Sequence, residues 1–334
     1  MKKLLFLMGM LSLLLAACNS NNPTTDKTTE EESSNKLSVY TTVYPLQYFT
    51  ERIGGDAVNV ASIYPAGANE HTFEPTQKDM MALADADLFF YIGLGLEGFV
   101  ENAKKTLANE DVKLVATAET VTDEQLHIST GHTHAEATTE NHNHEHEHDE
   151  EESHEDHAHT EHDAHVWLSP IISQQLALSI KEQLVAALPE QETTFIENYN
   201  ELVADLNTLH ADFEAMAKET TKKTFFVSHA AFGYIAGHYG FEQVPVAGLN
   251  SQSEPSQKEL TSIVDLAKKE DIDYIFFEQN VSSNLTKIIQ NELGANTLIL
   301  HNLSVLTKED IANNEDYFTL MRKNMDVLKQ ALEK

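Results

Sequence analysis

The chain has 334 residues, of which 54 are Asp or Glu and only 22 are Lys or Arg, so its formal net charge at pH 7 is −32. This acidity excludes nucleic acid and a basic membrane-binding surface as the basis of its function, and it favours cations as ligands. A single Cys excludes disulfides within the chain and zinc sites built from several thiolates.

The first residues have the features of a secretory signal peptide. Two lysines precede an apolar run that is too short to span a bilayer as a mature helix, and small residues follow it up to Cys18. The residues LAAC that end at Cys18 resemble the lipobox of bacterial lipoproteins, in which the Cys becomes the lipid-modified N-terminus; the alternative is an ordinary signal with a chance Cys. We therefore predict a signal peptide over 1–17, a lipid on Cys18, and a flexible polar tether over 18–36.

From Leu37 onward, short apolar segments alternate with amphipathic ones. Apolar segments at 37–44, 58–65 and 88–93 are the predicted strands, and a helix is predicted from Thr76. This alternation is typical of an α/β fold. We predict a first α/β lobe over 37–188.

The segment between His127 and His165 is dominated by histidine. It holds twelve of the seventeen histidines, interleaved with twelve Asp or Glu and no Lys or Arg. Imidazole is the commonest protein ligand for zinc, so the composition predicts a collector of divalent metal; the alternative is an acidic segment with accidental histidines. With so few apolar side chains it cannot form a core, and we predict a disordered loop over 127–162. Its predicted accessory metal ligands are His132, His134, His142, His144, His146, His148, His154, His157, His159 and His162.

A single long helix is predicted in the middle of the chain. Apolar residues recur alternately every four and three positions, which places them on one face of a helix from about Glu190 to about Thr220. Such a rod is either half of a coiled coil or a stiff connector between two lobes, and the surrounding α/β pattern favours a connector over 189–221. The apolar stripe consists of Phe195, Tyr199, Leu202, Leu206, Leu209, Phe213 and Met216.

The remainder of the chain, 222–334, repeats the scheme of the first lobe. The hexapeptide EPTQKD at 74–79 recurs as EPSQKE at 254–259, each time with Thr or Ser three residues before an acidic residue. This is a capping box that opens a helix, and an aromatic-rich strand follows each copy. Chance similarity over six positions is the alternative to two related α/β lobes.

Four histidines lie beside predicted strands or helices at positions suited to a ligand site. They are His71, His165, His229 and His301. In open α/β sheets, ligands bind beyond the carboxyl ends of the strands, so these side chains can converge on one crevice. The alternative for each is a hydrogen-bonded loop histidine, and we assign His210 and His238, on predicted helices, to that structural role.

Several motifs together resemble the zinc-specific solute-binding lipoproteins of bacterial ABC importers, the ZnuA/AdcA type of the metal-binding cluster A-I family. They are the lipobox, GANEHTFEP, the His-rich acidic insertion, DAHVWLSP, SHAAFGYIAGHYG, SQSEPSQKEL and DYIFFE. The resemblance covers essentially the whole mature chain. It implies two α/β lobes joined by one long connector helix, with a metal site at the lobe interface and His71, His165 and His229 as its three imidazole ligands.

The fourth ligand departs from the pattern of that family. The resemblance implies an Asp or Glu in the loop after the last core strand, but the two corresponding positions are His301 and Ser304. We expect His301 as the fourth ligand, ahead of a water and ahead of Glu278 or Glu70. Three or four imidazoles favour zinc, copper or nickel over manganese. The acidic side chains expected to orient the imidazoles are Glu70, Glu74 and Asp163.

The resemblance implies capture and delivery without catalysis. A monomeric protein, anchored outside the bacterial cell membrane by the lipid on Cys18, would bind Zn²⁺ and present it to the permease of an ABC importer, with the His-rich loop as accessory collector or sensor. The alternatives are a manganese-binding transport lipoprotein and a surface adhesin that uses the tract. A secreted zinc hydrolase is disfavoured because the chain has no HExxH or GxSxG motif.

Overall fold

The computed structural model describes residues 36–131, 162–251, 255–279 and 283–333. The predicted signal peptide, Cys18 and nearly all of the predicted tether lie outside the described residues, as does the body of the His tract from 132 to 161. All the described residues belong to one compact unit.

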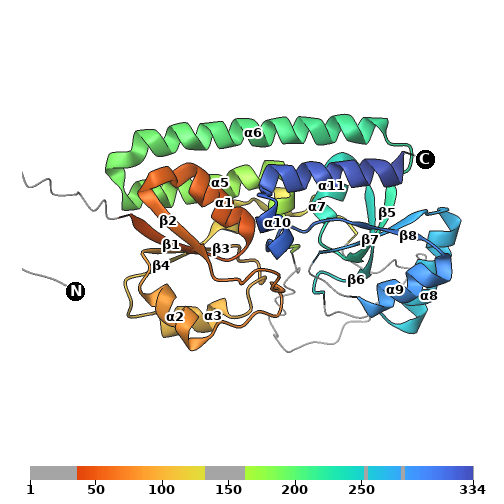
Figure 1. Cartoon of the computed structure of the whole chain (residues 1–334), viewed down its shortest axis with the longest axis horizontal. Coiled ribbons are helices and arrows are strands. Elements are labelled where there is room, and N and C mark those ends of the chain that lie inside the picture. Colours follow the sequence, from red (N-terminus) through yellow and green to blue (C-terminus); the bar gives the residue numbers. More distant parts are fainter. Residues whose placement is uncertain (1–35, 132–161, 252–254, 280–282, 334) are drawn as a thin grey trace, which may run out of the picture. The chain divides into compact units, whose positions relative to one another are not determined.

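The first half of the chain forms a parallel sheet of four described strands, ordered β2-β1-β3-β4 (Figure 1). Strand β3 (LFFY) is buried along its whole length, as expected for a parallel strand covered on both faces. The strands are β1 (Leu37–Thr41), β2 (Val58–Ser62), β3 (Leu88–Tyr91) and β4 (Lys113–Ala116). The helices of this half are α1 (Tyr44–Gly54), α2 (Gln77–Ala84), α3 (Val100–Thr106) and α4 (Asp123–Leu126).

The second half forms a parallel sheet with the same topology. Its strand order is β6-β5-β7-β8. The second strand of the lobe, β6, lies at the edge of the sheet next to the first strand, β5, as β2 lies next to β1 in the first lobe. The strands are β5 (Thr224–His229), β6 (Glu242–Ala247), β7 (Tyr274–Phe277) and β8 (Asn296–Ile299). The helices are α7 (Gly233–Tyr239), α8 (Gln257–Lys269), α9 (Asn284–Leu293), α10 (Lys308–Ala312) and α11 (Tyr317–Leu332). The predicted fold of two α/β lobes is confirmed.

The repeated hexapeptide opens equivalent helices in the two lobes. The Thr76 hydroxyl accepts the Asp79 backbone N–H at the start of α2, and the Ser256 hydroxyl accepts that of Glu259 at the start of α8. In both places the acidic side chain accepts the N–H of the capping residue in return. The predicted capping boxes are therefore both present.

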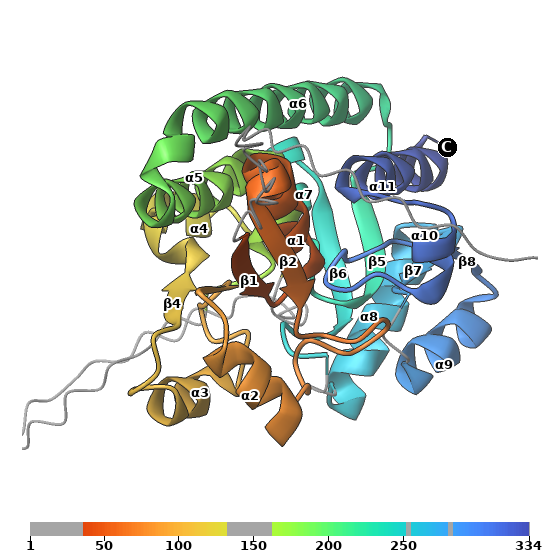
Figure 2. The same cartoon turned by 60° about the vertical axis from the view of Figure 1, so that its left-hand side comes forward.

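Helix α5 (Pro170–Ala187) packs on the first lobe, and helix α6 (Glu192–Glu219) connects the two lobes. The 28 residues of α6 make a rod of about 42 Å at 1.5 Å per residue. It packs against α1 and α5 on the first lobe and against α7 and α11 on the second (Figures 1 and 2). Six of the seven residues of the predicted apolar stripe are buried, and Tyr199 is half-buried. The division of the chain at residues 188 and 221 stays a prediction.

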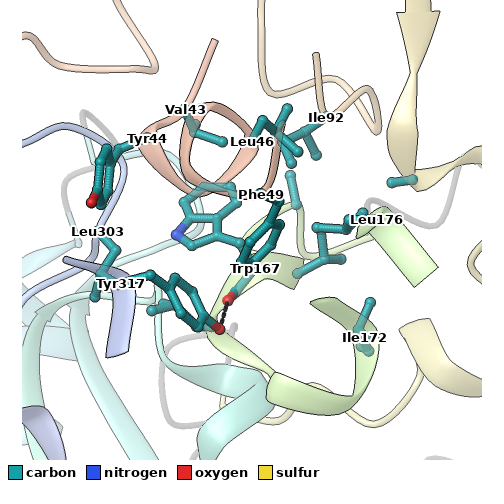
Figure 3. Close-up of a cluster of buried hydrophobic side chains, with 14 of the residues drawn as sticks. Val43, Tyr44, Leu46, Phe49, Ile92, Trp167, Ile172, Leu176, Leu303 and Tyr317 are labelled. Atoms are coloured by element: carbon teal, nitrogen blue, oxygen red, sulfur yellow. Dashed lines mark hydrogen bonds between the residues drawn. The ribbon is translucent and has the colours of Figure 1, made fainter. Parts of the chain in front are cut away.

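The larger of two buried hydrophobic clusters joins the two lobes around Trp167. The indole is fully buried and donates from Nε1 to the carbonyl of Asn302, at 2.7 Å. Around it, Phe49 of α1 meets Tyr317 of α11 edge to face, with ring centroids 5.0 Å apart (Figure 3). The Tyr317 hydroxyl donates to the carbonyl oxygen of Trp167, at 2.8 Å. Because this cluster includes residues of both lobes, its close packing holds the lobes together, while a second cluster lies within the second lobe alone.

Among the described residues, no helix is long and apolar enough to cross a membrane.

Candidate metal centre

Three of the predicted ligands, from distant parts of the chain, meet between the lobes. One nitrogen from each of His71, His165 and His229 lies within 4.8 Å of the other two. The ring centroids are 5.3 Å apart for His71 and His165, 5.1 Å for His71 and His229, and 4.9 Å for His165 and His229. The structure therefore brings together the three imidazoles that the resemblance implied.

Local structure explains how each ring reaches this point. His71 lies in the loop between β2 and α2. Its backbone N–H donates to the side-chain oxygen of Asn69 at 3.0 Å, which fixes a tight turn. His165 directly precedes the short 3₁₀ helix Val166–Leu168, which buries its apolar side chains in the core. His229 is the last residue of β5. Two of the three thus lie at or beyond the carboxyl ends of parallel strands, where ligand sites form in α/β folds.

Carboxylates orient two of the imidazoles. Asp163 accepts from Nδ1 of His165 at 2.7 Å, and Glu278 accepts from Nδ1 of His229 at 3.0 Å. In His165, a donor N–H on Nδ1 leaves the lone pair on Nε2, which is the atom available to a metal ion. In His229, Nε2 lies 2.9 Å from the Leu249 carbonyl oxygen, which only accepts hydrogen bonds, so this nitrogen must release its proton before it binds a metal ion. The Nε2 atoms of His71 and His165 are buried without a hydrogen-bond partner among the described residues. Unsatisfied buried nitrogens are costly unless a ligand occupies the space between them.

The electrostatics differ among the three rings. Burial, followed by repulsion from the other two rings, lowers the pKa of His71 to about 2. Burial alone would lower the pKa of His229, but the Glu278 carboxylate outweighs it and raises that pKa to about 9. Near neutral pH the empty centre therefore has a neutral His71 ready to bind a cation, and a proton on His229 that an arriving cation must displace.

Asn302 contacts the acidic residues beside the three histidines, and the sequence did not reveal this position. Its Nδ2 donates to Glu70 at 3.1 Å and to Glu278 at 2.8 Å, so one amide holds two buried carboxylates from different lobes. Burial raises the pKa of Glu70. Burial also opposes ionisation of Glu278, but the neighbouring His229 ring outweighs it and keeps the pKa of Glu278 below its usual range. Asn302 thus orients the negative charge beside the three histidines.

We expect Asn302→Leu to weaken metal binding by roughly 10–100-fold, the usual effect of removing a group that orients metal ligands. Leucine has a similar size but no donor, so both carboxylates lose a hydrogen bond. Asn198→Leu is the matched control, because Asn198 on α6 donates to the Ile53 carbonyl at 2.9 Å, away from the centre. Zinc titrations against a competing chelator measure the difference. Equal affinity in the two variants would show that Asn302 does not position the centre.

The structure does not bring His301 into the group of three. Its Nδ1 accepts the Leu303 backbone N–H at 2.9 Å, and its Nε2 lies 3.1 Å from the Asp310 carboxylate of α10. Both ring nitrogens are therefore engaged by the protein. Of the predicted acidic neighbours, Glu70, Asp163 and Glu278 surround the three histidines, whereas Glu74 is exposed and makes no ion pair or hydrogen bond with any of them within the described chain. Ser304 bonds to the Asn302 side chain.

The segments that flank the His tract are fixed in place by α7. Ser129 donates to Asp163 at 2.5 Å, which links the start of the tract to the residue that orients His165. A Cβ atom on Gly233 would overlap Ser129, and one on Gly237 would overlap the Ile128 carbonyl. The sequence does carry a sign of this close approach. Gly233 and Gly237 lie four positions apart and therefore on one face of α7, where the missing side chains leave room for another segment.

The histidines assigned to structural roles lie elsewhere. His210 of α6 bonds through Nδ1 to the Tyr239 hydroxyl, at 3.1 Å. Burial lowers the pKa of His238 to about 4. No further group of three or more metal-ligating side chains occurs in the described ranges.

Two parallel α/β lobes, a single long connecting helix and three converging imidazoles define a metal-binding member of the two-lobed solute-binding proteins. The chain belongs to the ZnuA family, described as zinc-uptake complex component A, periplasmic, whose model matches residues 39–331. Members of this family serve transport as solute-binding components and are not enzymes.

Proteins with similar sequences have names that fit this family. The high-affinity zinc uptake system protein ZnuA of Bacillus subtilis is 34% identical, and the match covers 98% of this chain and 97% of that protein. The zinc-binding lipoprotein AdcA of Streptococcus pneumoniae strain R6 is 33% identical over the whole of this chain. Such streptococcal relatives are longer proteins: this chain spans 62% of the pneumococcal one and 56% of a Streptococcus pyogenes one.

A solved structure shares the fold. The Zn(II)-bound ZnuA-like domain of Streptococcus pneumoniae AdcA is 31% identical and superimposes with a TM-score of 0.69, over 90% of this chain and all of that one.

Proposed function

We propose that the chain captures Zn²⁺ outside the cytoplasm for import, with His71, His165 and His229 as the ligands. The observation that carries this is the group of three buried imidazoles within 4.8 Å of one another, two with unpartnered Nε2 atoms. Neutral imidazoles suit zinc better than manganese, which prefers more carboxylate oxygen. The names of the relatives and the zinc in the related pneumococcal domain support the same ion.

For the fourth position we propose Glu70 or a water in place of His301. The Glu70 carboxylate lies 3.9 Å from Nε2 of His71, so a small movement brings it to an ion between the imidazoles. To bind the ion, the His301 ring would first have to break its contacts with the Leu303 backbone N–H and the Asp310 carboxylate. A carboxylate in the fourth position also offsets part of the ion's charge in a buried site.

Delivery to the permease of an ABC importer completes the proposed cycle. This step is supported by the family description as a component of an uptake complex and by the relative named as an uptake system protein. We further propose that the protein acts as a monomer and is held at the outer face of the membrane by a lipid on Cys18, because LAAC resembles a lipobox and the pneumococcal relative is named a lipoprotein. The His tract would serve as an accessory zinc collector or sensor.

Growth under zinc limitation tests this function. A strain without this chain is expected to stop growing in medium with a zinc chelator, and to recover with added zinc or with the unmodified gene. The gene with His165→Ala should not restore growth, because the centre would lose one of its three ligands. Recovery with manganese instead of zinc would identify a manganese transporter, and loss of surface attachment alone would identify an adhesin.

A further inference from the structure

Two of the nitrogens available to the ion are closed off from solvent. The Nε2 atoms of His71 and His165 are buried, and the two side chains are only 8% and 1% exposed. A pocket of about 220 Å³ nevertheless lies beside both rings, which form part of its wall. An ion that enters this pocket therefore reaches the buried nitrogens only if a neighbouring part of the wall moves.

On the first lobe, the wall of this pocket includes a tight turn over 93–96, after β3. The Leu96 backbone N–H donates to the Gly93 carbonyl at 3.1 Å, and the two central residues, Leu94 and Gly95, have positive φ, at 55° and 81°. Asparagine followed by glycine is the usual pair in such a turn, because asparagine tolerates a left-handed backbone better than leucine does. Leu94 therefore stands where the local backbone disfavours it.

Contacts with the rest of the first lobe keep Leu94 in this place. The Glu97 carboxylate, 5% exposed, accepts the backbone N–H groups of Ile92 and Gly93 at 2.8 and 3.0 Å and fixes the start of the turn. The Leu94 side chain is half-buried, packs partly against the larger hydrophobic cluster and lines the pocket. A disfavoured backbone that its surroundings enforce is typical of ligand-binding sites.

The second lobe supplies a leucine to the same pocket. Leu249 is half-buried there, and its carbonyl oxygen is the one that lies 2.9 Å from Nε2 of His229. One leucine from each lobe thus lines the pocket next to the imidazoles. Neither side chain has an atom that binds zinc, so an ion that passes them loses part of its water and gains no ligand in exchange.

We propose that Leu94 is a gate on the path of the ion: it sets how fast zinc enters and leaves the centre, and it does not bind the ion. The proposal rests on the function proposed above for His71, His165 and His229. An apolar wall raises the free energy of an ion in the pocket, because a charge is poorly solvated beside it. Entry and release cross the same barrier, so Leu94 slows both and leaves the equilibrium affinity unchanged.

Leu94→Gly tests the gate in the full chain, because glycine accepts the left-handed backbone and removes the apolar side chain. Leu94→Asn repeats the test with the residue that such a turn normally carries. The matched control is Asp271→Gly, at an exposed residue with φ 49° between α8 and β7.

Zinc loading is followed by stopped-flow fluorescence, because the single Trp of the chain, Trp167, lies 5.3 Å from His165 between ring centroids. Release is followed by the same signal after addition of excess EDTA, and the dissociation constant is measured by titration against a competing chelator.

We expect Leu94→Gly to raise the rates of zinc loading and release by about tenfold each, the effect of a barrier lower by about 1.4 kcal/mol. Leu94→Asn should act in the same direction, the dissociation constant should stay unchanged in both variants, and Asp271→Gly should change neither rate. Unchanged rates in both Leu94 variants would overturn the gate. A changed dissociation constant with an unchanged loading rate would overturn it too, because Leu94 would then belong to the binding surface. Absence of tight zinc binding by the unmodified chain would overturn the zinc centre, and the gate with it.

Discussion

His71→Ala is expected to remove tight zinc binding without destabilising the empty protein. The change deletes one of three ligands, so the affinity should fall by more than the roughly 100-fold upper range seen for groups that only orient ligands. Nε2 of His71 has no hydrogen-bond partner among the described residues, so the protein without zinc loses no hydrogen bond from that atom. Burial and the two neighbouring rings also lower the pKa of His71, so no charged form of the ring is lost.

Thermal unfolding with and without zinc measures this effect. Zinc at a thousand times its dissociation constant should stabilise the unmodified chain by about 4 kcal/mol, and this gain should disappear in His71→Ala.

His301→Ala is the matched control and should behave in the opposite way. It removes an acceptor for the Leu303 N–H and the partner of Asp310, so the empty protein becomes less stable. Its zinc affinity should remain close to that of the unmodified chain. A loss of affinity in His301→Ala as large as that in His71→Ala would show that His301 turns inward to bind the ion.

Trp167→Ala has the largest expected effect on stability. The side chain is fully buried where the cores of the two lobes meet, and truncation of such a residue costs about 3–5 kcal/mol. Zinc affinity should fall as well, because Trp167 anchors the 3₁₀ helix that follows His165. Circular dichroism during thermal unfolding measures the loss, since the variant has no Trp fluorescence.

Trp167→Phe separates packing from hydrogen bonding. It keeps an aromatic ring but loses the donor to the Asn302 carbonyl, so an intermediate loss of stability is expected. A loss within about 0.5 kcal/mol for Trp167→Ala, the range of ordinary surface changes, would contradict a shared core that fixes the lobes.

The sequence was sufficient for features that arise within short segments. The α6 stripe, the capping boxes at Thr76 and Ser256 and the alternation of strands and helices are set by neighbouring residues, so periodicity and helix-start signals revealed them. The strand ends before His71 and at His229, together with the family motifs, pointed to His71, His165 and His229.

Only the tertiary structure shows that His301 lies apart from the three imidazoles. Leu303 adopts a left-handed backbone with φ 58°, its N–H bonds to the His301 ring, and α10 supplies Asp310 from the other side. Asn302 bonds to Glu278 within its own lobe, but it reaches Glu70 only because the two lobes pack together. Local patterns specify helices, strands and candidate ligands, but a ligand shell depends on contacts between distant segments, which arise only when the core around Trp167 closes.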